Sequence, residues 1–182
     1  HGDLLGGAVI SNDEQFLRQC RLGTLMHFGA VIAPFTAFLV CRGMKTLGVR
    51  MRQYNESALK IARWLESDPR IETVRYPLLE SNPQYEIARR QMRDFGGMLS
   101  FEVKGGRAAG VKLVNALHLV TVAVSLGDAE TLIEHPASMT HSTYTEEELA
   151  ASGIAAGLIR LSVGLENAED LIADLKQALD TL

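Results

Sequence analysis

The chain has 182 residues, of which 47% are apolar and 22% are charged, the balance of a globular protein with a buried core. Its net charge is −4, and Lys and Arg are spread along it without a basic stripe, so nucleic-acid partners are not expected. The longest apolar runs are short and one of them contains Pro34, so no membrane-spanning segment is expected.

Cysteine usage indicates a reducing compartment. Cys20 and Cys41 are too few for a disulfide framework, and their spacing is not that of metal ligands. The first residues also lack the basic start and the cleavage site of a secretory signal. We therefore expect reduced thiols in a cytoplasmic protein.

The first part of the chain is predicted to contain one short strand and one helix. The apolar stretch GGAVI at residues 6–10 predicts a short buried strand. The segment SNDEQFLRQCRL that follows predicts a helix, which Ser11 or Asn12 would cap.

The longest helical stretch follows Pro34 and extends to residue 67. Gly43 and Gly48 inside this stretch predict a bend or a break. Because a helix of this length usually bridges two units, we expect a domain boundary in it, with one domain in residues 1–47 and a second in residues 48–182. One buried stripe is predicted from apolar residues that recur every three or four positions: Tyr54, Ala58, Ile61, Ala62 and Leu65.

Beyond the long helix, strands alternate with helices. The predicted strands cover residues 71–76, 98–103, 119–125 and 158–164. Helix starts are predicted at Asn82 with Pro83, at Asn167, and at Thr145, where Glu148 three residues later completes a capping box. The pattern predicts an α/β unit whose four-stranded sheet is covered by helices on one face.

Arg160 in the last predicted strand is the first candidate for chemistry. Alternation places Ile159 and Leu161 toward the core and Arg160 on the other face. Two interpretations are open: a solvated strand arginine, or a planar guanidinium that binds a carboxylate in a cleft. The sequence SLGD at 125–128 directly follows a strand, so it is either a simple turn at Gly127 or a loop that brings a hydroxyl and backbone N–H groups to the same cleft.

Other polar motifs favour structural roles. His135 and His141 are six residues apart and lack the helical spacing of two ligands to one metal, so no metal site is expected. The segment EHPASMTHS at 134–142 contains Pro136 and predicts a loop or a strand edge. The glycine pairs at 96–97 and 105–106 predict turns, and neither a G-x-G-x-x-G motif nor a P-loop is present.

Five motifs occur in an order that resembles one family. They are HGDLLGG, RGMKTLGVRM, FGGMLSFEVKGG, AVSLGDAETLIEHPASMTHS and GLIRLSVGLENAEDLIADL. The chain resembles the pyridoxal-phosphate-dependent enzymes of cysteine and methionine metabolism, which include methionine γ-lyase, the cystathionine lyases, cystathionine γ-synthase and the homoserine sulfhydrylases. The resemblance implies the fold type I architecture of aspartate aminotransferase, here as the end of the large coenzyme domain (1–47), a bridging helix and a small C-terminal domain with a mainly antiparallel four-stranded sheet.

The resemblance also implies where the site residues lie. His1-Gly2-Asp3 looks like the end of the family's lysine signature, so the lysine that forms the Schiff base is expected just before His1, and no catalytic or cofactor-binding residue is expected in this segment. Pyridoxal 5′-phosphate supplies the electron sink, and the protein supplies orientation. By resemblance, Arg160 binds the substrate α-carboxylate. The neighbouring substrate-binding residues would be Ser125, Leu126, Thr140 and Val124.

Two positions bear on the substrate. Cystathionine-processing members carry a glutamate where this chain has Val124, so the sequence is more similar to methionine γ-lyase. Against this, methionine γ-lyases usually carry a Lys-Asp pair where this chain has Leu25-Met26. The resemblance implies α,γ-elimination of L-methionine or homocysteine to 2-oxobutyrate, ammonia and a thiol.

Three alternatives stay open. The first two are a cystathionine γ-lyase or γ-synthase and an O-acylhomoserine sulfhydrylase of the same family. The third is a non-catalytic assembly module, if the protein truly starts at His1. The family resemblance further implies a homo-oligomer, a tetramer built from dimers that share their active sites.

Overall fold

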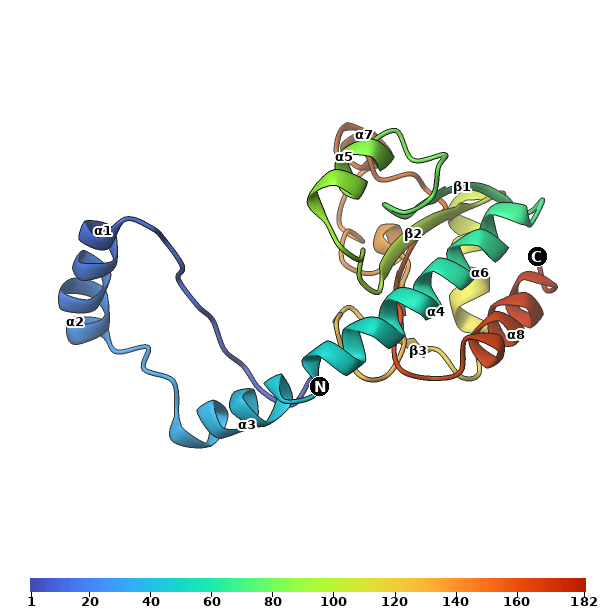
Figure 1. The fold of residues 1–182 in the computed structure, drawn as a ribbon. Helices are drawn as coiled ribbons and strands as arrows, with labels where there is room; N and C mark the ends of the chain where they lie inside the picture. Colours follow the sequence, from blue (N-terminus) through green and yellow to red (C-terminus); the bar gives the residue numbers. More distant parts are fainter. The chain divides into compact units, whose positions relative to one another are not determined.

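The computed structural model describes residues 1–182, and its elements form two units that are described separately. The first unit contains His1 and Asp3–Leu47, and the second contains Gly2 and Gly48–Leu182 (Figure 1). The assignment of residues 1–47 to a large coenzyme domain stays a prediction. No helix of the structure has the length and apolar character needed to cross a membrane.

Helices make up the regular structure of the first unit. Helix α1 (Glu14–Gln19), the π-helical segment η1 (Cys20–Leu25) and α2 (Met26–Phe28) follow one another without interruption, and α3 (Pro34–Met44) comes after a short connection (Figure 1). None of these helices has a buried residue. Their apolar side chains therefore find no core within this unit.

Two predictions for the first unit are wrong. Residues 6–10 form no strand, and Ile10 is 91% exposed, because no neighbouring strand is present to accept its backbone hydrogen bonds. The cap of α1 is Asp13, not Ser11 or Asn12: the Asp13 side chain accepts from the backbone N–H of Phe16 at 3.0 Å. Ser11 instead accepts from the backbone N–H of Asp13. The charged carboxylate of Asp13 is a better acceptor at the N-terminus of a helix than the hydroxyl of Ser11 or the amide of Asn12.

The predicted break in the long helical stretch is confirmed. Helix α3 ends at Met44 and α4 (Leu47–Ser67) begins three residues later. Lys45 and Thr46 between them donate their backbone N–H groups to the carbonyls of Arg42 and Gly43, which is a tighter turn than the α-helix makes. The predicted stripe is also confirmed, because all five of its residues are buried on α4.

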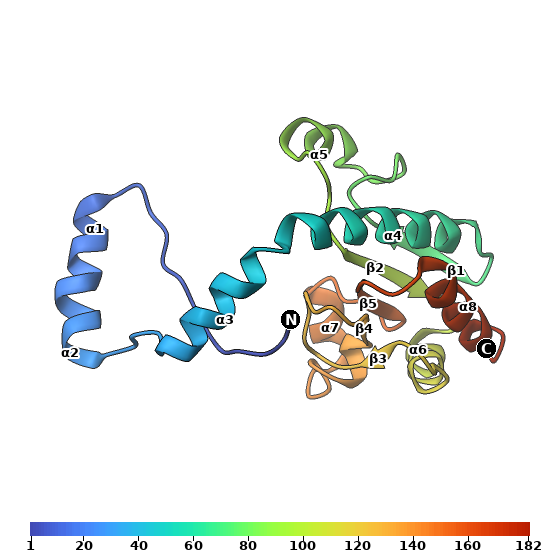
Figure 2. The same ribbon diagram turned by 60° about the horizontal axis from the view of Figure 1, so that its bottom comes forward.

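The second unit contains a mixed five-stranded sheet in the order β1-β2-β5-β4-β3 (Figure 2). The strands are β1 (Ile71–Arg75), β2 (Met98–Val103), β3 (Thr121–Val122), β4 (Leu132–Glu134) and β5 (Leu158–Ser162). The pairs β1–β2, β2–β5 and β5–β4 are antiparallel, and β3–β4 is parallel.

The four-stranded description therefore needs a correction. Strand β4 was not predicted: of its residues only Glu134 lies in the segment 134–142, which was predicted as a loop or strand edge. The predicted strand at 119–125 is reduced to two residues. Three-residue strands that are buried on both faces show no alternation, so β4 carried no period-two signal in the sequence.

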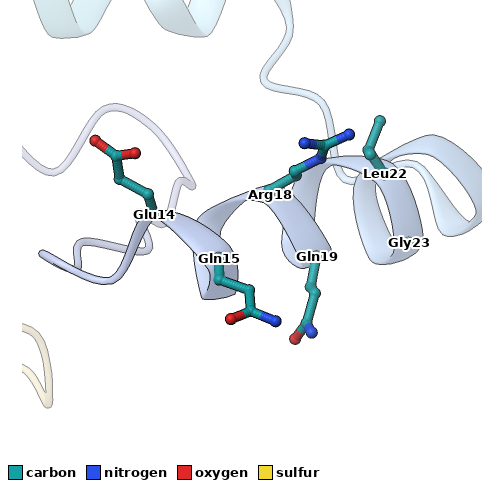
Figure 3. A pocket seen from close by; sticks show the side chains of 6 residues that line it. All are labelled: Glu14, Gln15, Arg18, Gln19, Leu22 and Gly23. Atoms are coloured by element: carbon teal, nitrogen blue, oxygen red, sulfur yellow. The ribbon is translucent and has the colours of Figure 1, made fainter.

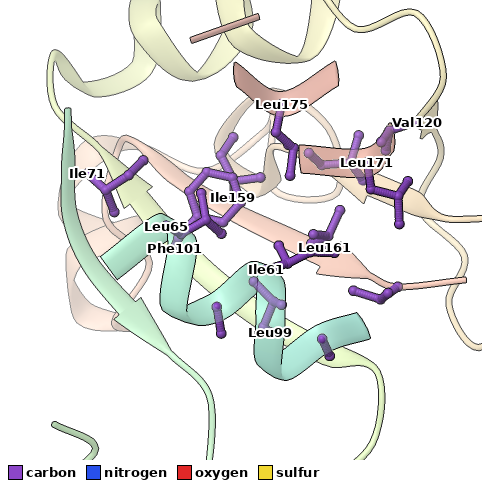
Figure 4. Packing of buried hydrophobic residues seen from close by; sticks show 14 of the residues in the cluster. Ile61, Leu65, Ile71, Leu99, Phe101, Val120, Ile159, Leu161, Leu171 and Leu175 are labelled. Carbon is purple, nitrogen blue, oxygen red and sulfur yellow. The ribbon is translucent and has the colours of Figure 1, made fainter. Parts of the chain in front are cut away.

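Helices α4, α6 (Gly106–Asn115) and α8 (Ala168–Leu179) share one core with the sheet. The predicted alternation on β5 is confirmed, because Ile159 and Leu161 are fully buried. Figure 4 shows these residues against Ile61 and Leu65 of α4 and Leu171 and Leu175 of α8. The expectation of a sheet covered by helices is thus confirmed.

Two of the three helix starts that were predicted in the second unit are confirmed. Thr145 and Glu148 form the predicted capping box of α7 (Glu146–Ala151), and Asn167 caps α8. Helix α5 (Tyr85–Gln91) begins later than predicted, because the side chain of Asn82 accepts from the backbone N–H of Gln84 in a turn that precedes the helix.

Candidate functional site

Arg160 lies in the middle of β5, between Ser100 of β2 and Glu134 of β4. Its Nη2 donates to the carbonyl oxygens of Val124 and Ser125, at 2.8 and 3.0 Å. Its Nη1 lies 2.8 Å from Oε1 of Glu134. The side chain is 26% exposed, so it is accessible and at the same time held by the protein. These contacts do not fit the interpretation of Arg160 as a solvated strand arginine.

The loop that carries Val124 and Ser125 is fixed at its far end. The backbone N–H of Gly127 donates to Oγ of Ser162 at 2.8 Å, and Gly127 has a φ of 76°, which favours glycine. The hydroxyl of Tyr54 donates to the carbonyl of Asp128 at 3.0 Å. Because both contacts come from the packed part of the unit, the loop carbonyls are presented to Arg160 by the fold.

The predicted substrate-binding residues are brought together only in part. Val124, Ser125 and Leu126 lie on the exposed loop beside Arg160, and Ser125 contacts the guanidinium through its carbonyl oxygen, not through its hydroxyl. Thr140 is exposed, and the contact of its hydroxyl is with Nδ1 of His141 at 3.0 Å. The role of Thr140 at this site stays a prediction.

Glu134 is the residue of this site that the sequence did not reveal. It ends β4, its side chain is 3% exposed, and its carboxylate faces Arg160 across the strand pair. The Oε2 atom is buried without a hydrogen-bond partner. An acid opposite Arg160 could have been found only from the β4–β5 register, which requires that β4 itself be recognised.

His135, next to Glu134, has a structural role. It is fully buried, with Nδ1 at 2.7 Å from Oγ of Ser138 and Nε2 at 2.8 Å from the carbonyl oxygen of Ala156. Burial lowers the pKa of His135, although the hydrogen bond to Ala156 acts in the opposite direction. A neutral imidazole that donates from Nε2 and accepts at Nδ1 satisfies both contacts.

The groups around Arg160 do not fit direct binding of pyridoxal phosphate. They are two carbonyl oxygens and one carboxylate, all of which are acceptors that would disfavour a phosphate group. No lysine amine contacts Arg160. What they fit is the positive charge of the guanidinium, which they hold in place.

A separate hollow of about 880 Å³ lies on the first unit, beside α1 and η1. Figure 3 shows that its lining side chains project from a single helical segment in different directions. Glu14, Gln15, Arg18 and Gln19 are all exposed. Because its polar lining side chains are exposed and none is a buried group that points into it, we do not treat this hollow as a candidate site.

Comparisons with known proteins show the family of this chain. Residues 1–180 match the family described as Cys/Met metabolism PLP-dependent enzyme. The chain is 56% identical to the L-methionine gamma-lyase of Treponema denticola, over 100% of this chain and 45% of that protein. It is also 56% identical to the L-methionine gamma-lyase of Porphyromonas gingivalis, over 100% of this chain and 46% of that protein.

A solved structure is similar as well. It is the crystal structure of cystathionine gamma synthase from Xanthomonas oryzae pv. oryzae in complex with aminoacrylate and cysteine, with a TM-score of 0.91 and 44% identity, over 99% of this chain and 46% of that one. The chain spans less than half the length of the relatives it matches. The similarity to this solved structure confirms the predicted fold type I class. The chain belongs to the Cys/Met metabolism family of PLP-dependent enzymes.

Proposed function

We propose that residues 1–182 are part of a PLP-dependent carbon–sulfur lyase that converts L-methionine, or homocysteine, to 2-oxobutyrate, ammonia and a thiol. In this enzyme Arg160 binds the α-carboxylate of the substrate. The observation that carries the proposal is the geometry of Arg160, a partly exposed guanidinium held by the carbonyls of Val124 and Ser125.

Arg160 has donors to spare for a substrate. A guanidinium carries five N–H groups, and the three contacts within the chain engage only its terminal nitrogens, Nη1 and Nη2. At least two N–H groups, including Nε–H, are left for another acceptor. A substrate carboxylate would accept charge-assisted hydrogen bonds from them.

Binding the carboxylate sets the orientation of the α-carbon. The bonds at this carbon can be aligned with the coenzyme only if the substrate is held at a second point, and Arg160 supplies that point. We propose that Ser125 and the backbone of Leu126 contact the same carboxylate, and that Thr140 lines the same corner. The Schiff-base lysine is expected just before His1, so this segment supplies binding and orientation, not proton transfer.

Val124 supports methionine as the substrate. Its side chain is 55% exposed on the loop that contacts Arg160, where a glutamate would place a negative charge suited to a substrate with a second amino group. Both relatives described above are named L-methionine gamma-lyase. The pair Leu25-Met26, which differs from the Lys-Asp pair of methionine γ-lyases, is the residue pair that argues against this choice.

An alternative function within the family rests on a specific similarity. The chain is 44% identical to a cystathionine gamma synthase over 99% of this chain. A cystathionine γ-lyase or γ-synthase, or an O-acylhomoserine sulfhydrylase, would use Arg160 in the same way and differ in the leaving group. Val124 is the residue that favours the lyase acting on methionine over the cystathionine-processing enzymes, and it does not discriminate against the sulfhydrylase.

We also propose a homo-oligomer, a tetramer of two dimers that share their active sites. Helices α1, α2 and α3 bury none of their residues, and large apolar side chains such as Phe28 and Phe35 are 87% and 70% exposed. Surfaces of this kind are normally covered in the functional protein.

Both cysteines are free, which supports a cytoplasmic location.

The test uses the full-length protein that contains this chain. Purified protein should show the visible absorbance of the bound coenzyme and release 2-oxobutyrate from L-methionine or homocysteine. Cystathionine, and O-acetylhomoserine with a thiol, are assayed in parallel. A colourless protein that releases no oxo acid from methionine, homocysteine or cystathionine, and no acetate from O-acetylhomoserine with a thiol, would refute the proposal and favour the non-catalytic assembly module.

A further inference from the structure

We propose that Glu134 is a positioning residue: its carboxylate holds Nη1 of Arg160 and thereby fixes the guanidinium in the orientation that receives the substrate carboxylate. This inference rests on the proposed function of Arg160 and extends it to a residue outside the predicted site. Glu134 would not touch the substrate, because its side chain is 3% exposed.

The geometry around the guanidinium supports this role. Oε1 of Glu134 lies 2.8 Å from Nη1, while the carbonyls of Val124 and Ser125 accept from Nη2 on the loop side. The two terminal nitrogens are therefore held from different parts of the fold. A free arginine side chain populates many rotamers, and holding it in one of them before the substrate arrives removes part of the entropic cost of binding.

The register of the sheet makes the pairing a property of the fold. Glu134 and Arg160 are directly opposite each other on the antiparallel strands β4 and β5. The residues before Glu134, Leu132 and Ile133, are buried, so the end of β4 is anchored in the core. The carboxylate is thus delivered to Nη1 by a rigid strand, which is more precise than delivery by a loop.

The second carboxylate oxygen indicates that stability alone does not explain this glutamate. Oε2 is buried and has no hydrogen-bond partner in the chain. A buried acceptor without a donor is unfavourable, and an apolar side chain of similar size would avoid this cost. A carboxylate at this position is therefore better explained by what Oε1 does to Arg160.

The test compares three variants of the full-length holoenzyme. Glu134→Ala removes the acceptor, and Glu134→Gln keeps an oxygen that can accept from Nη1 while it removes the charge. Glu166→Gln is the matched control, because the Glu166 carboxylate contacts the backbone and hydroxyl of Thr131 and not Arg160. KM and kcat for L-methionine are measured, together with the dissociation constant of norleucine, an amino acid without sulfur, by calorimetry.

Glu134→Ala should raise KM and the norleucine dissociation constant roughly 2- to 12-fold, the range for ordering one long side chain on binding, with a smaller change in kcat. Glu134→Gln should stay within about 1.5-fold of the parent enzyme, because it keeps the acceptor for Nη1, and so should Glu166→Gln. In an Arg160→Ala background, Glu134→Ala should have no further effect on KM, because Glu134 acts through Arg160.

Several results would overturn the inference. They are an unchanged KM in Glu134→Ala, a loss in Glu134→Gln as large as in Glu134→Ala, tighter norleucine binding in either variant, or an additive effect in the Arg160→Ala background. A parent enzyme that is active on methionine while Glu134→Ala is unaffected refutes only the role of Glu134. A parent enzyme that neither binds norleucine nor releases an oxo acid refutes the proposed function itself.

Discussion

Replacing Arg160 by alanine should have two separable consequences. The first concerns the substrate: the variant loses the charge-assisted hydrogen bonds to the α-carboxylate. One such bond contributes about 1.5–3 kcal/mol, and each 1.4 kcal/mol is a factor of ten in affinity. KM for L-methionine should therefore rise roughly 10- to 150-fold.

The second consequence concerns the fold. Glu134 is 3% exposed, and Arg160 is its ion-pair partner. Removing one partner of a buried ion pair costs about 3–5 kcal/mol, because the other charge is left without compensation. Since the Arg160 side chain is itself 26% exposed, we expect the lower end of this range, about 3 kcal/mol. The variant should fold, but it should unfold at a lower temperature than the parent protein.

A double variant separates the two effects. Arg160→Ala combined with Glu134→Gln removes the uncompensated charge, so it should recover most of the unfolding temperature, while its KM should stay as high as in Arg160→Ala. Both quantities are measured on the full-length enzyme, by 2-oxobutyrate release and by thermal unfolding. An Arg160→Ala enzyme with the parent KM would refute the role of Arg160 in binding. Equal unfolding temperatures for Arg160→Ala and the parent would refute the ion pair.

Three further predictions concern the second unit. Val124→Glu should lower kcat/KM for methionine and raise it for cystathionine, and equal losses on both substrates would refute the role of Val124. Burial acts to raise the pKa of Asp174, but hydrogen bonds from the backbone N–H groups of residues 118–120 outweigh it and hold that pKa below its ordinary value. The stability that Asp174 provides is then full above about pH 4 and lost as pH falls through the lowered pKa, so Asp174→Ala should remove this acid-dependent part of an unfolding titration. Leu161→Ala should lower the free energy of unfolding by about 2–5 kcal/mol in chemical denaturation, because Leu161 is fully buried, and a loss under about 1 kcal/mol would contradict this core.

Local patterns were sufficient to predict much of the second unit. The buried stripe of α4, the alternation in β5 and the capping box at Thr145 all depend on residues a few positions apart, and all three are present. The strand predicted at residues 6–10 failed because an apolar run becomes a strand only when a neighbouring strand accepts its hydrogen bonds. Such a partner is not a property of the run itself.

The candidate site was also predicted only in part. The sequence alone determined that Arg160 lies on a strand face opposite the core, and the family motifs associated it with Ser125. Tertiary structure decided that the guanidinium contacts the carbonyls of Val124 and Ser125, and that Glu134 is its ion-pair partner. The physical reason is distance along the chain: Glu134 and Arg160 are 26 residues apart, and only the pairing of β4 with β5 brings the two charges together.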